Sequence, residues 1–307
     1  MDHKFMTQLK YNKDFEPNTG QLVTIAPNIA RLVAPNTSPF TFTGTNSYFI
    51  GNKNLAIIDP GPNDEAHLSA LITAIGGREL QAIILTHTHK DHSGLARRLS
   101  EKTDAPIWFG GKHRLSRPKR FLEVNLLKNA CDWQLEPDRV LLEGDILSFG
   151  DIELEVVNTA GHCANHLSFG VVGSPYIFTG DHVMGWNSSL IATPDGSLAD
   201  YFASLDRLID LDWEQYLPGH GGEIVKGREY ALALKTHREK RNGQILAALK
   251  RKYLSANELL EIIYPLHKGR RRFAARLTLK AHLEYLLDRG EIASSISLRG
   301  ILYDVNF

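Results

Sequence analysis

Cysteine is scarce in this sequence: Cys131 and Cys163 are the only two among 307 residues. Two cysteines are too few for a disulfide framework, and these two stand too far apart in the sequence for a four-thiolate zinc site. Any metal site in this chain is therefore expected to use nitrogen and oxygen ligands.

Long apolar runs are also missing. No stretch approaches the roughly 20 consecutive apolar residues that a membrane span needs. The first six residues, Met-Asp-His-Lys-Phe-Met, lack the apolar stretch of a signal peptide. We therefore expect a cytoplasmic protein with no membrane partner. Apolar residues make up 43% and charged residues 23%, which is ordinary globular usage and excludes disordered, collagen-like and coiled-coil proteins.

An excess of charge of either sign is absent as well, because 35 basic and 35 acidic side chains balance. The balance is uneven along the chain. Residues 236–307 contain 14 Lys and Arg against 7 Asp and Glu, a net charge of +7, so residues 1–235 carry −7. This asymmetry predicts a catalytic domain over 1–235 and a second domain over 236–307 that is suited to anionic partners.

The pattern of apolar residues predicts an α/β protein. Residues 21–59 read as three or four antiparallel strands, and a helix over 64–75 is followed by a strand over 80–87 and a helix over 92–100. Further strands recur between 107 and 180, and Ser197 with Asp200 opens another helix. Strand runs with interspersed helices in two successive halves predict two sheets packed face to face with helices outside, a four-layer αββα sandwich.

The last 80 residues read mainly as helix. A helix reaches Tyr253, a second is opened by Ser255 and Glu258 as a capping box, and a third covers 273–289. A β-hairpin around Arg299-Gly300 closes the chain. Three helices followed by a β-ribbon predict a small winged-helix-like domain. A basic run stands just before its third helix: Lys268, Arg270, Arg271 and Arg272.

Histidine is plentiful, with 13 residues, and the densest group is the segment THTHKDH over 86–92. Alternate residues of a strand point the same way, which places His87 and His89 together. Asp91 and His92 fall where the chain turns into a helix. Four ligand-type side chains within six residues cannot all reach one tetrahedral ion that keeps a position open for water. They can divide between two adjacent ions.

Three more ligand-type residues stand at the ends of expected strands. These are His162, Asp181 and His220, and a glycine precedes each of them. Glycine permits the sharp backbone geometry and close approach that a metal ligand at a strand end requires.

The order and context of these residues resemble the metallo-β-lactamase superfamily, over roughly residues 21–235. The resemblance rests on the HxHxDH block at 87–92, on His162, Asp181 and His220, and on Asp59 in Ile-Asp-Pro-Gly. The whole chain further resembles the lactamase-beta-like hydrolases that end in a winged-helix domain, a branch that includes single-stranded RNA endonucleases.

The resemblance implies a role for each of these residues. The first metal is expected to be bound by His87, His89 and His162, and the second by Asp91, His92 and His220. Asp181 would bridge the two ions, and Asp59 would orient the ligands through hydrogen bonds. His166 and His182, next to these ligands in the sequence, are candidates for orienting or substrate contacts.

The remaining histidines are expected to be packed or solvated residues without a role in the site. They are His3, His67, His113, His237, His267 and His282. Cys163 is expected to be a small packed residue.

Two divalent ions about 3.5–4 Å apart would hold a hydroxide, polarise the scissile bond and steady the leaving group. Asp91 is the side chain best placed to orient the hydroxide and pass its proton on. Zinc fits the nitrogen-rich ligand set, and manganese or iron tolerate the same ligands. The sequence thus predicts a metal-dependent hydrolase, with two Zn2+ as its cofactor.

The sequence is compatible with several classes of substrate. One hypothesis is hydrolysis of a small ester, thioester or lactone. Another is single-stranded RNA cleavage, favoured by the basic run at 268–272. A non-catalytic nucleic-acid adaptor and an iron-dependent oxidoreductase on the same scaffold are further alternatives. Periplasmic β-lactam hydrolysis is disfavoured because no export segment is visible.

Overall fold

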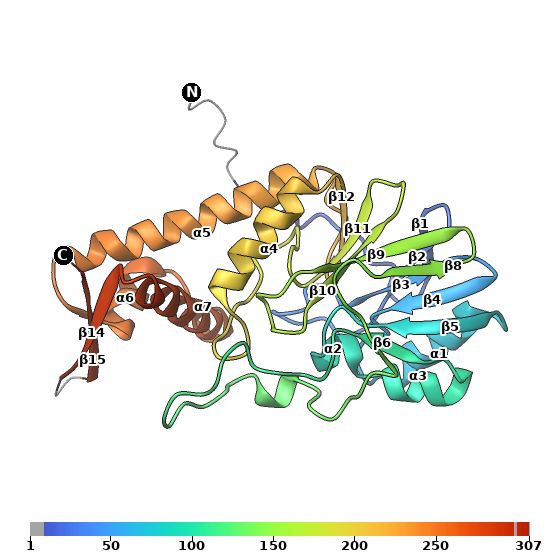
Figure 1. Cartoon of the computed structure of the whole chain (residues 1–307), viewed down its shortest axis with the longest axis horizontal. Helices are drawn as coiled ribbons and strands as arrows, with labels where there is room; N and C mark the ends of the chain where they lie inside the picture. Colours follow the sequence, from blue (N-terminus) through green and yellow to red (C-terminus); the bar gives the residue numbers. More distant parts are fainter. Residues whose placement is uncertain (1–8, 298–299, 307) are drawn as a thin grey trace.

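The computed structural model describes residues 9–297 and 300–306, and most of its strands form two mixed sheets that pack face to face (Figure 1). The first sheet has seven strands in sequence order, antiparallel from β1 to β4 and parallel from β4 to β7. Its strands are β1 (Leu22–Ala26), β2 (Ile29–Val33), β3 (Asn46–Ile50), β4 (Asn54–Ile58), β5 (Glu79–Ile84), β6 (Ile107–Phe109) and β7 (Arg139–Val140).

The second sheet has five strands in the order β12-β11-β10-β9-β8. Its pairs are antiparallel except for the parallel pair of β11 and β12. Its strands are β8 (Ile146–Phe149), β9 (Ile152–Asn158), β10 (Leu167–Val171), β11 (Tyr176–Gly180) and β12 (Gln215–Pro218).

Helices cover the outer face of each sheet. One core cluster joins the first sheet to α1 (Glu65–Ile75) and α3 (Ala96–Thr103), and another joins the second sheet to α4 (Leu198–Asp210) and α5 (Gly227–Leu249). A third cluster fills the space between the sheets, where Tyr48 meets Phe178 edge to face. Alternation along the strands explains this division, because successive side chains point to opposite faces. The layers therefore run helix, sheet, sheet, helix.

The helix expected over 92–100 is interrupted. The chain instead forms α2 (Lys90–Ser93) and, after Gly94 and Leu95, α3. At the break the backbone is drawn onto the segment after β4, because Leu95 N–H donates to Gly61 O and Gly61 N–H donates to His92 O. A Cβ at Gly94 would lie 2.6 Å from Asn63 N, so only glycine fits this contact.

The C-terminal residues form a small unit around a fourth core cluster. It contains β13 (Leu254–Ser255), α6 (Ala256–Ile263), α7 (Gly269–Asp288), β14 (Ile292–Ser297) and β15 (Gly300–Val305), and the three strands pair in the order β13-β15-β14. The Ser255 and Glu258 capping box opens α6 as expected. Arg299, at the expected hairpin turn, lies outside the described residues. The structure thus shows a small three-stranded sheet with helices, and a winged-helix-like domain stays a prediction.

The structure adds detail at the expected domain boundary and changes the start of one C-terminal helix. Residue 235 falls inside α5, a single helix whose first half packs on the α/β sandwich and whose second half packs on the C-terminal unit. The third C-terminal helix begins at Gly269, so Arg270, Arg271 and Arg272 lie in its first turn, not before it. Within the described residues no helix is long and apolar enough to cross a membrane.

Candidate metal centre

The seven ligand-type residues come from segments that follow the carboxyl ends of strands. His87 and His89 follow β5, His162 follows β9, Asp181 comes directly after β11 and His220 comes shortly after β12. Asp91 and His92 lie in α2, the short helix that the chain enters next. These strand ends lie at one edge of the sandwich, which brings together side chains up to 133 positions apart in sequence.

Three histidines form the first half of the cluster. The ligand-type nitrogens of His87, His89 and His162 all lie within 4.8 Å of one another. His89 Nδ1 is 2.9 Å from His162 Nε2, and the rings of His87 and His89 are 4.6 Å apart between centroids. All three side chains are buried.

Asp91, His92 and His220 form the second half. His92 Nε2 is 3.2 Å from His220 Nε2, and Asp91 Oδ2 is 3.4 Å from the same His220 nitrogen. Asp181 stands between the halves. Its Oδ2 is 3.7 Å from His162, and its Oδ1 is 3.3 Å from His220 and 3.4 Å from His92.

Hydrogen bonds to acceptors fix which nitrogen of four rings carries the proton. His162 Nδ1 donates to Leu190 O at 2.6 Å, and His220 Nδ1 donates to Gly44 O at 3.1 Å. His92 Nδ1 lies 2.9 Å from Asp59, and His89 Nε2 lies 2.9 Å from Asp195, both carboxylates. Because these partners are acceptors, the opposite nitrogen of each neutral ring presents a lone pair to the cluster.

His87 follows the same rule through Thr86. The Thr86 hydroxyl donates to Asp59 Oδ2 at 2.7 Å, so it can only accept from His87 Nδ1, which lies 2.9 Å away. Asp59 Oδ1 accepts from Thr86 N–H at 2.7 Å. Asp59 therefore orients both His87 and His92, which agrees with the orienting role expected for it.

When the five rings are neutral, the inward atoms of the cluster are all acceptors. Among the described residues, His87 Nε2 and Asp181 Oδ1 are buried without a hydrogen-bond partner. Lone pairs that face each other across about 3 Å repel, and a buried carboxylate without a partner is costly. A cation in each half removes both problems, so this donor set fits a dinuclear metal site, whose metal the side chains do not specify.

The pKa shifts of the cluster residues in the absence of metal also favour the binding of a cation. Burial raises the pKa of Asp91, yet the neighbouring His92 and His220 hold it well below its usual value. Burial, assisted by His89, lowers the pKa of His162 to about 4. Burial also opposes protonation of His220, but the charge of Asp181 outweighs it and raises the pKa of His220 to about 9. The carboxylates thus stay charged and attract positive charge into the cluster.

Glycine is required before the ligands that follow the second sheet. Gly161 and Gly180 adopt φ of +144° and +47°, where a side chain is strained. A Cβ at Gly219 would lie 2.6 Å from the His92 ring and 2.9 Å from Asp181 Oδ1. The backbone therefore approaches the cluster more closely than any other residue would allow.

Sequence reasoning missed a buried group behind His89. Asp195 has no exposed surface, and its second oxygen lies 2.8 Å from His113 Nε2. His113 was expected to be a packed or solvated residue outside the site; it is packed, but it also joins the network that holds a cluster residue. Asp195 lies in a loop 106 positions from His89, and only the fold brings them together.

Cys131 also belongs to this neighbourhood. Its Sγ is 3.8 Å from Asp195 Oδ1, and its ligand-type atom lies within 4.8 Å of those of His89 and Asp195. A thiol therefore lies beside the cluster, whose own seven members are all His and Asp and offer only nitrogen and oxygen. Cys163 is packed and fully buried, as expected.

The other candidate residues lie outside the cluster. His166 is fully buried, with Nδ1 2.8 Å from Thr159 Oγ1, and its Nε2 accepts from the N–H of Asp181. It therefore orients Asp181, and its burial leaves no surface for a substrate. The ring of His182 is also fully buried and packs 4.5 Å from that of Tyr201, away from solvent.

The basic run at 268–272 belongs to the C-terminal unit. Lys268, Arg270 and Arg271 are exposed at the start of α7, whereas Arg272 pairs with Glu261 of α6.

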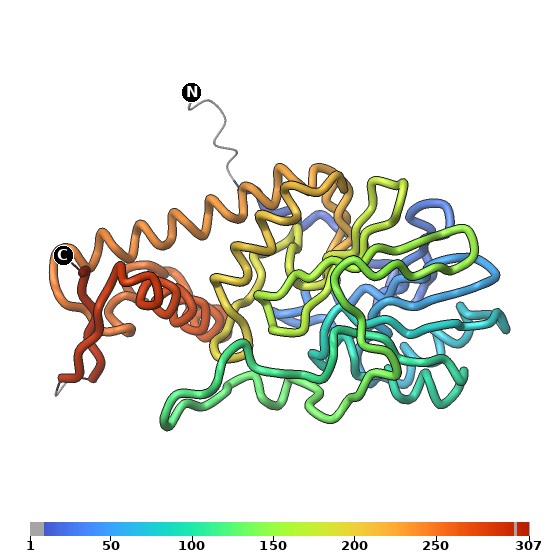
Figure 2. Tube along the Cα trace, viewed as in Figure 1, coloured from blue at the N-terminus to red at the C-terminus, as the bar shows by residue number. Residues whose placement is uncertain are grey.

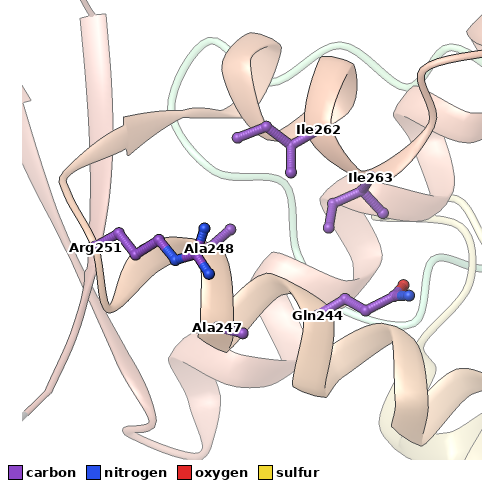
Figure 3. A pocket seen from close by; sticks show the side chains of 6 residues that line it. All are labelled: Gln244, Ala247, Ala248, Arg251, Ile262 and Ile263. Atoms are coloured by element: carbon purple, nitrogen blue, oxygen red, sulfur yellow. The ribbon is translucent and has the colours of Figure 1, made fainter.

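An open pocket of about 320 Å³ also lies in the C-terminal unit, between α5 and α6 (Figure 3). Figure 3 shows its lining of Gln244, Ala247, Ala248, Arg251, Ile262 and Ile263. None of these is a ligand-type residue of the cluster. The metal-site candidate is instead the buried group at the edge of the sandwich.

Comparisons with curated proteins give relatives of similar length. The chain is 27% identical over 269 residues to "Beta-lactamase-like protein 2 homolog" from Caenorhabditis elegans, covering 86% of this chain and 85% of that protein. It is 27% identical over 275 residues to "Atrochrysone carboxyl ACP thioesterase" from Claviceps purpurea, covering 85% and 79%.

Solved structures support the fold over nearly the whole chain. A beta-lactamase domain protein from Burkholderia ambifaria superposes with a TM-score of 0.80 at 23% identity, covering 99% of both chains. A metallo-beta-lactamase family protein from Thermus thermophilus has a TM-score of 0.75 at 25% identity, covering 92% of this chain and 100% of that one.

The family model for the metallo-beta-lactamase superfamily matches residues 40–220. That range contains all seven ligand-type residues of the cluster and Asp59. This chain is therefore a hydrolase that belongs to the metallo-beta-lactamase superfamily.

Proposed function

We propose that this protein hydrolyses acyl thioesters at a dinuclear metal centre. The observation that carries the proposal is the buried set of inward acceptors, divided between two groups and spanned by Asp181. Relatives named as acyl carrier protein thioesterases, 25–27% identical to this chain, favour the thioester over other acyl substrates.

Each residue of the cluster would have a defined role in the proposed reaction. His87, His89 and His162 would hold one ion, Asp91, His92 and His220 the other, and Asp181 both. When bound, the ions would lower the pKa of water and polarise the thioester carbonyl. Asp91 has the most exposed side chain among the three residues of the second half, at 31%, and its carboxylate is ionised. It is therefore placed to accept the proton of water and deliver it to the departing thiolate.

Zinc is the metal we propose. Five of the seven ligands are imidazoles, which suit zinc, and manganese and iron accept the same set. We also propose that the protein acts in the cytoplasm.

RNA cleavage is the second candidate. The exposed Lys268, Arg270 and Arg271 at the start of α7 favour it, since exposed cations contact phosphates. In that case the C-terminal unit would act as a winged-helix-like RNA-binding domain. The ion pair between Arg272 and Glu261 leaves one fewer cation for that role.

A direct assay tests the proposal. The purified protein, loaded with zinc, should bind close to two ions per chain and release thiol from octanoyl-N-acetylcysteamine. Asp181→Ala should lose both ions and the activity, because one carboxylate serves both halves. The control is Asp212→Ala, a change at a fully exposed carboxylate, which should behave as wild type. Cleavage of a fluorogenic single-stranded RNA without thiol release would overturn the thioester assignment.

A further inference from the structure

The loop between β6 and β7 carries an unusual charge. Its first part, residues 112–128, contains six Lys and Arg and a single Glu, a net charge of +5, within a region, 1–235, that carries −7 overall. The rest of the loop, 129–138, adds three acidic residues, so the positive charge is confined to the first part. Figure 2 shows this loop leaving the sandwich and running toward the C-terminal helices. An anionic partner would therefore meet a local concentration of positive charge on an otherwise acidic region.

The same loop exposes apolar side chains. Phe121 is 94% exposed, Leu122 84%, Val124 68% and Leu126 57%. Single exposed apolar residues are common, but four within six residues are a local concentration of the kind that interaction sites show.

Ion pairs fasten the loop to α7. Arg117 binds Glu284 of α7 at 2.5 Å and Glu123 of its own loop at 2.6 Å, and Lys280 of α7 binds Glu123 at 2.6 Å. Glu123 and Glu284 are thereby neutralised. Lys119 and Arg120 lie between the fastened positions and are exposed, and Arg120 also approaches Glu284, at 3.6 Å.

Helix α7 continues the surface. Arg276 and Phe273 stand four and seven positions before Lys280, so they share its helix face. Arg276 is exposed, and Phe273 is 42% exposed. We define the carrier surface as Lys119, Arg120, Phe121, Leu122, Phe273 and Arg276.

Both ends of the loop adjoin the metal centre. On one side Cys131 forms a backbone bridge with His89, and Asp132 N–H donates to Thr88 O. On the other side the Ser116 hydroxyl donates to the carbonyl of Pro194, the residue before Asp195. A partner docked on the loop would therefore sit on the element that borders the metal-binding residues.

We propose that the carrier surface docks an acidic acyl carrier protein, which delivers its thioester to the metal centre. This inference rests on the proposed thioester hydrolysis. Acidic side chains of the carrier would pair with Lys119, Arg120 and Arg276, and apolar side chains would cover Phe121 and Leu122. Within residues 121–126, three of the four exposed apolar side chains are aliphatic, and apolar side chains of a protein partner can cover them.

The test compares two thioesters that differ only in the carrier. Octanoyl attached to the phosphopantetheine of an acidic bacterial acyl carrier protein is measured beside octanoyl-N-acetylcysteamine. The double variant Lys119→Glu/Arg120→Glu should lower kcat/KM for the carrier substrate at least 10-fold and leave the small thioester unchanged. Added salt should weaken only the carrier reaction, because exposed charges are screened.

A matched control reverses charge elsewhere. Lys250→Glu/Lys252→Glu changes two exposed cations at and after the end of α5 and should leave both reactions unchanged. Phe121→Ser/Leu122→Ser should repeat the selective loss without changing charge.

Three results would overturn the docking proposal. The first is an equal fall in kcat/KM for both thioesters in Lys119→Glu/Arg120→Glu. The second is a fall in kcat/KM for the carrier substrate in the control variant that is as large as the fall in Lys119→Glu/Arg120→Glu. The third is tight binding of the protein to phosphatidylglycerol vesicles without any preference for the carrier. Failure of the proposed function looks different: neither thioester is hydrolysed. In that case direct binding of the octanoyl carrier, weakened by Lys119→Glu/Arg120→Glu, would still support docking, and absence of binding would refute it.

Discussion

At the scale of single residues, the site depends on partners that hold each imidazole from outside. Leu190 O, Gly44 O, Asp59 and Asp195 accept from four different rings and leave the opposite nitrogens free for metal. Asp195 differs from the two carbonyls because it adds a negative charge next to His89. A carboxylate behind a metal-binding histidine fixes the tautomer and raises the basicity of the ligand.

Asp195→Asn should therefore weaken metal binding by roughly 10- to 100-fold, the range typical of such partners. The amide keeps the shape but loses the charge, and it can accept from only one of His89 and His113. The loss should fall on the ion held by His89, so one of two ions should become weak. Competition with a chromophoric chelator measures this, and nitrogen NMR of the His89 ring reports its tautomer. Asp212→Asn is the control, and wild-type affinity for both ions in Asp195→Asn would refute the role.

At the scale of elements, local sequence rules held where the contacts are local. Asp64 caps α1 by accepting from His67 N–H, and Ser255 with Glu258 forms the expected capping box of α6. They failed at α2 and α3, where Gly61, from another part of the chain, splits the helix. They also failed at α7, whose first residues have no capping side chain to mark its start.

Helix α5 offers a prediction of its own because it serves both units. Gly243 lies inside this helix, and a Cβ there meets nothing within 4 Å. Gly243→Ala should stabilise the protein by about 0.5–1 kcal/mol, since alanine loses less backbone entropy in a helix. Urea denaturation with a linear fit measures the change in the free energy of unfolding.

The control for this change lies at the start of the same helix. A Cβ at Gly227 would lie 2.1 Å from the Tyr216 ring, so Gly227→Ala should destabilise. A destabilised Gly243→Ala would show that the helix does not tolerate a side chain at that position.

At the scale of the whole molecule, metal binding should be coupled to proton release. Without metal, the pKa of His220 is raised to about 9, so at pH 7.5 this ring is mostly protonated. A protonated ring has no lone pair for a metal, and the proton must leave when the ion binds. Affinity for zinc should consequently fall as the pH is lowered from 9 toward 6.

Titration calorimetry in two buffers with different ionisation enthalpies measures the released protons. The apparent enthalpy should differ between the buffers by an amount proportional to the protons released. Identical enthalpies in both buffers at pH 7.5 would contradict proton release.

The sequence by itself determined the class of the fold, the THTHKDH segment and the three glycine-preceded ligands, because alternation and strand-end position are local properties. The sequence determined less about the side chains that surround the ligand-type residues. Asp195 and His113 approach His89 only through tertiary packing, and no local pattern distinguishes them from ordinary loop residues. The carrier surface was equally hidden, since ion pairs between Arg117 and Glu284, 167 positions apart, bring its two elements together. Long-range pairing decided these features because it depends on how the sheets, α5 and the C-terminal unit pack.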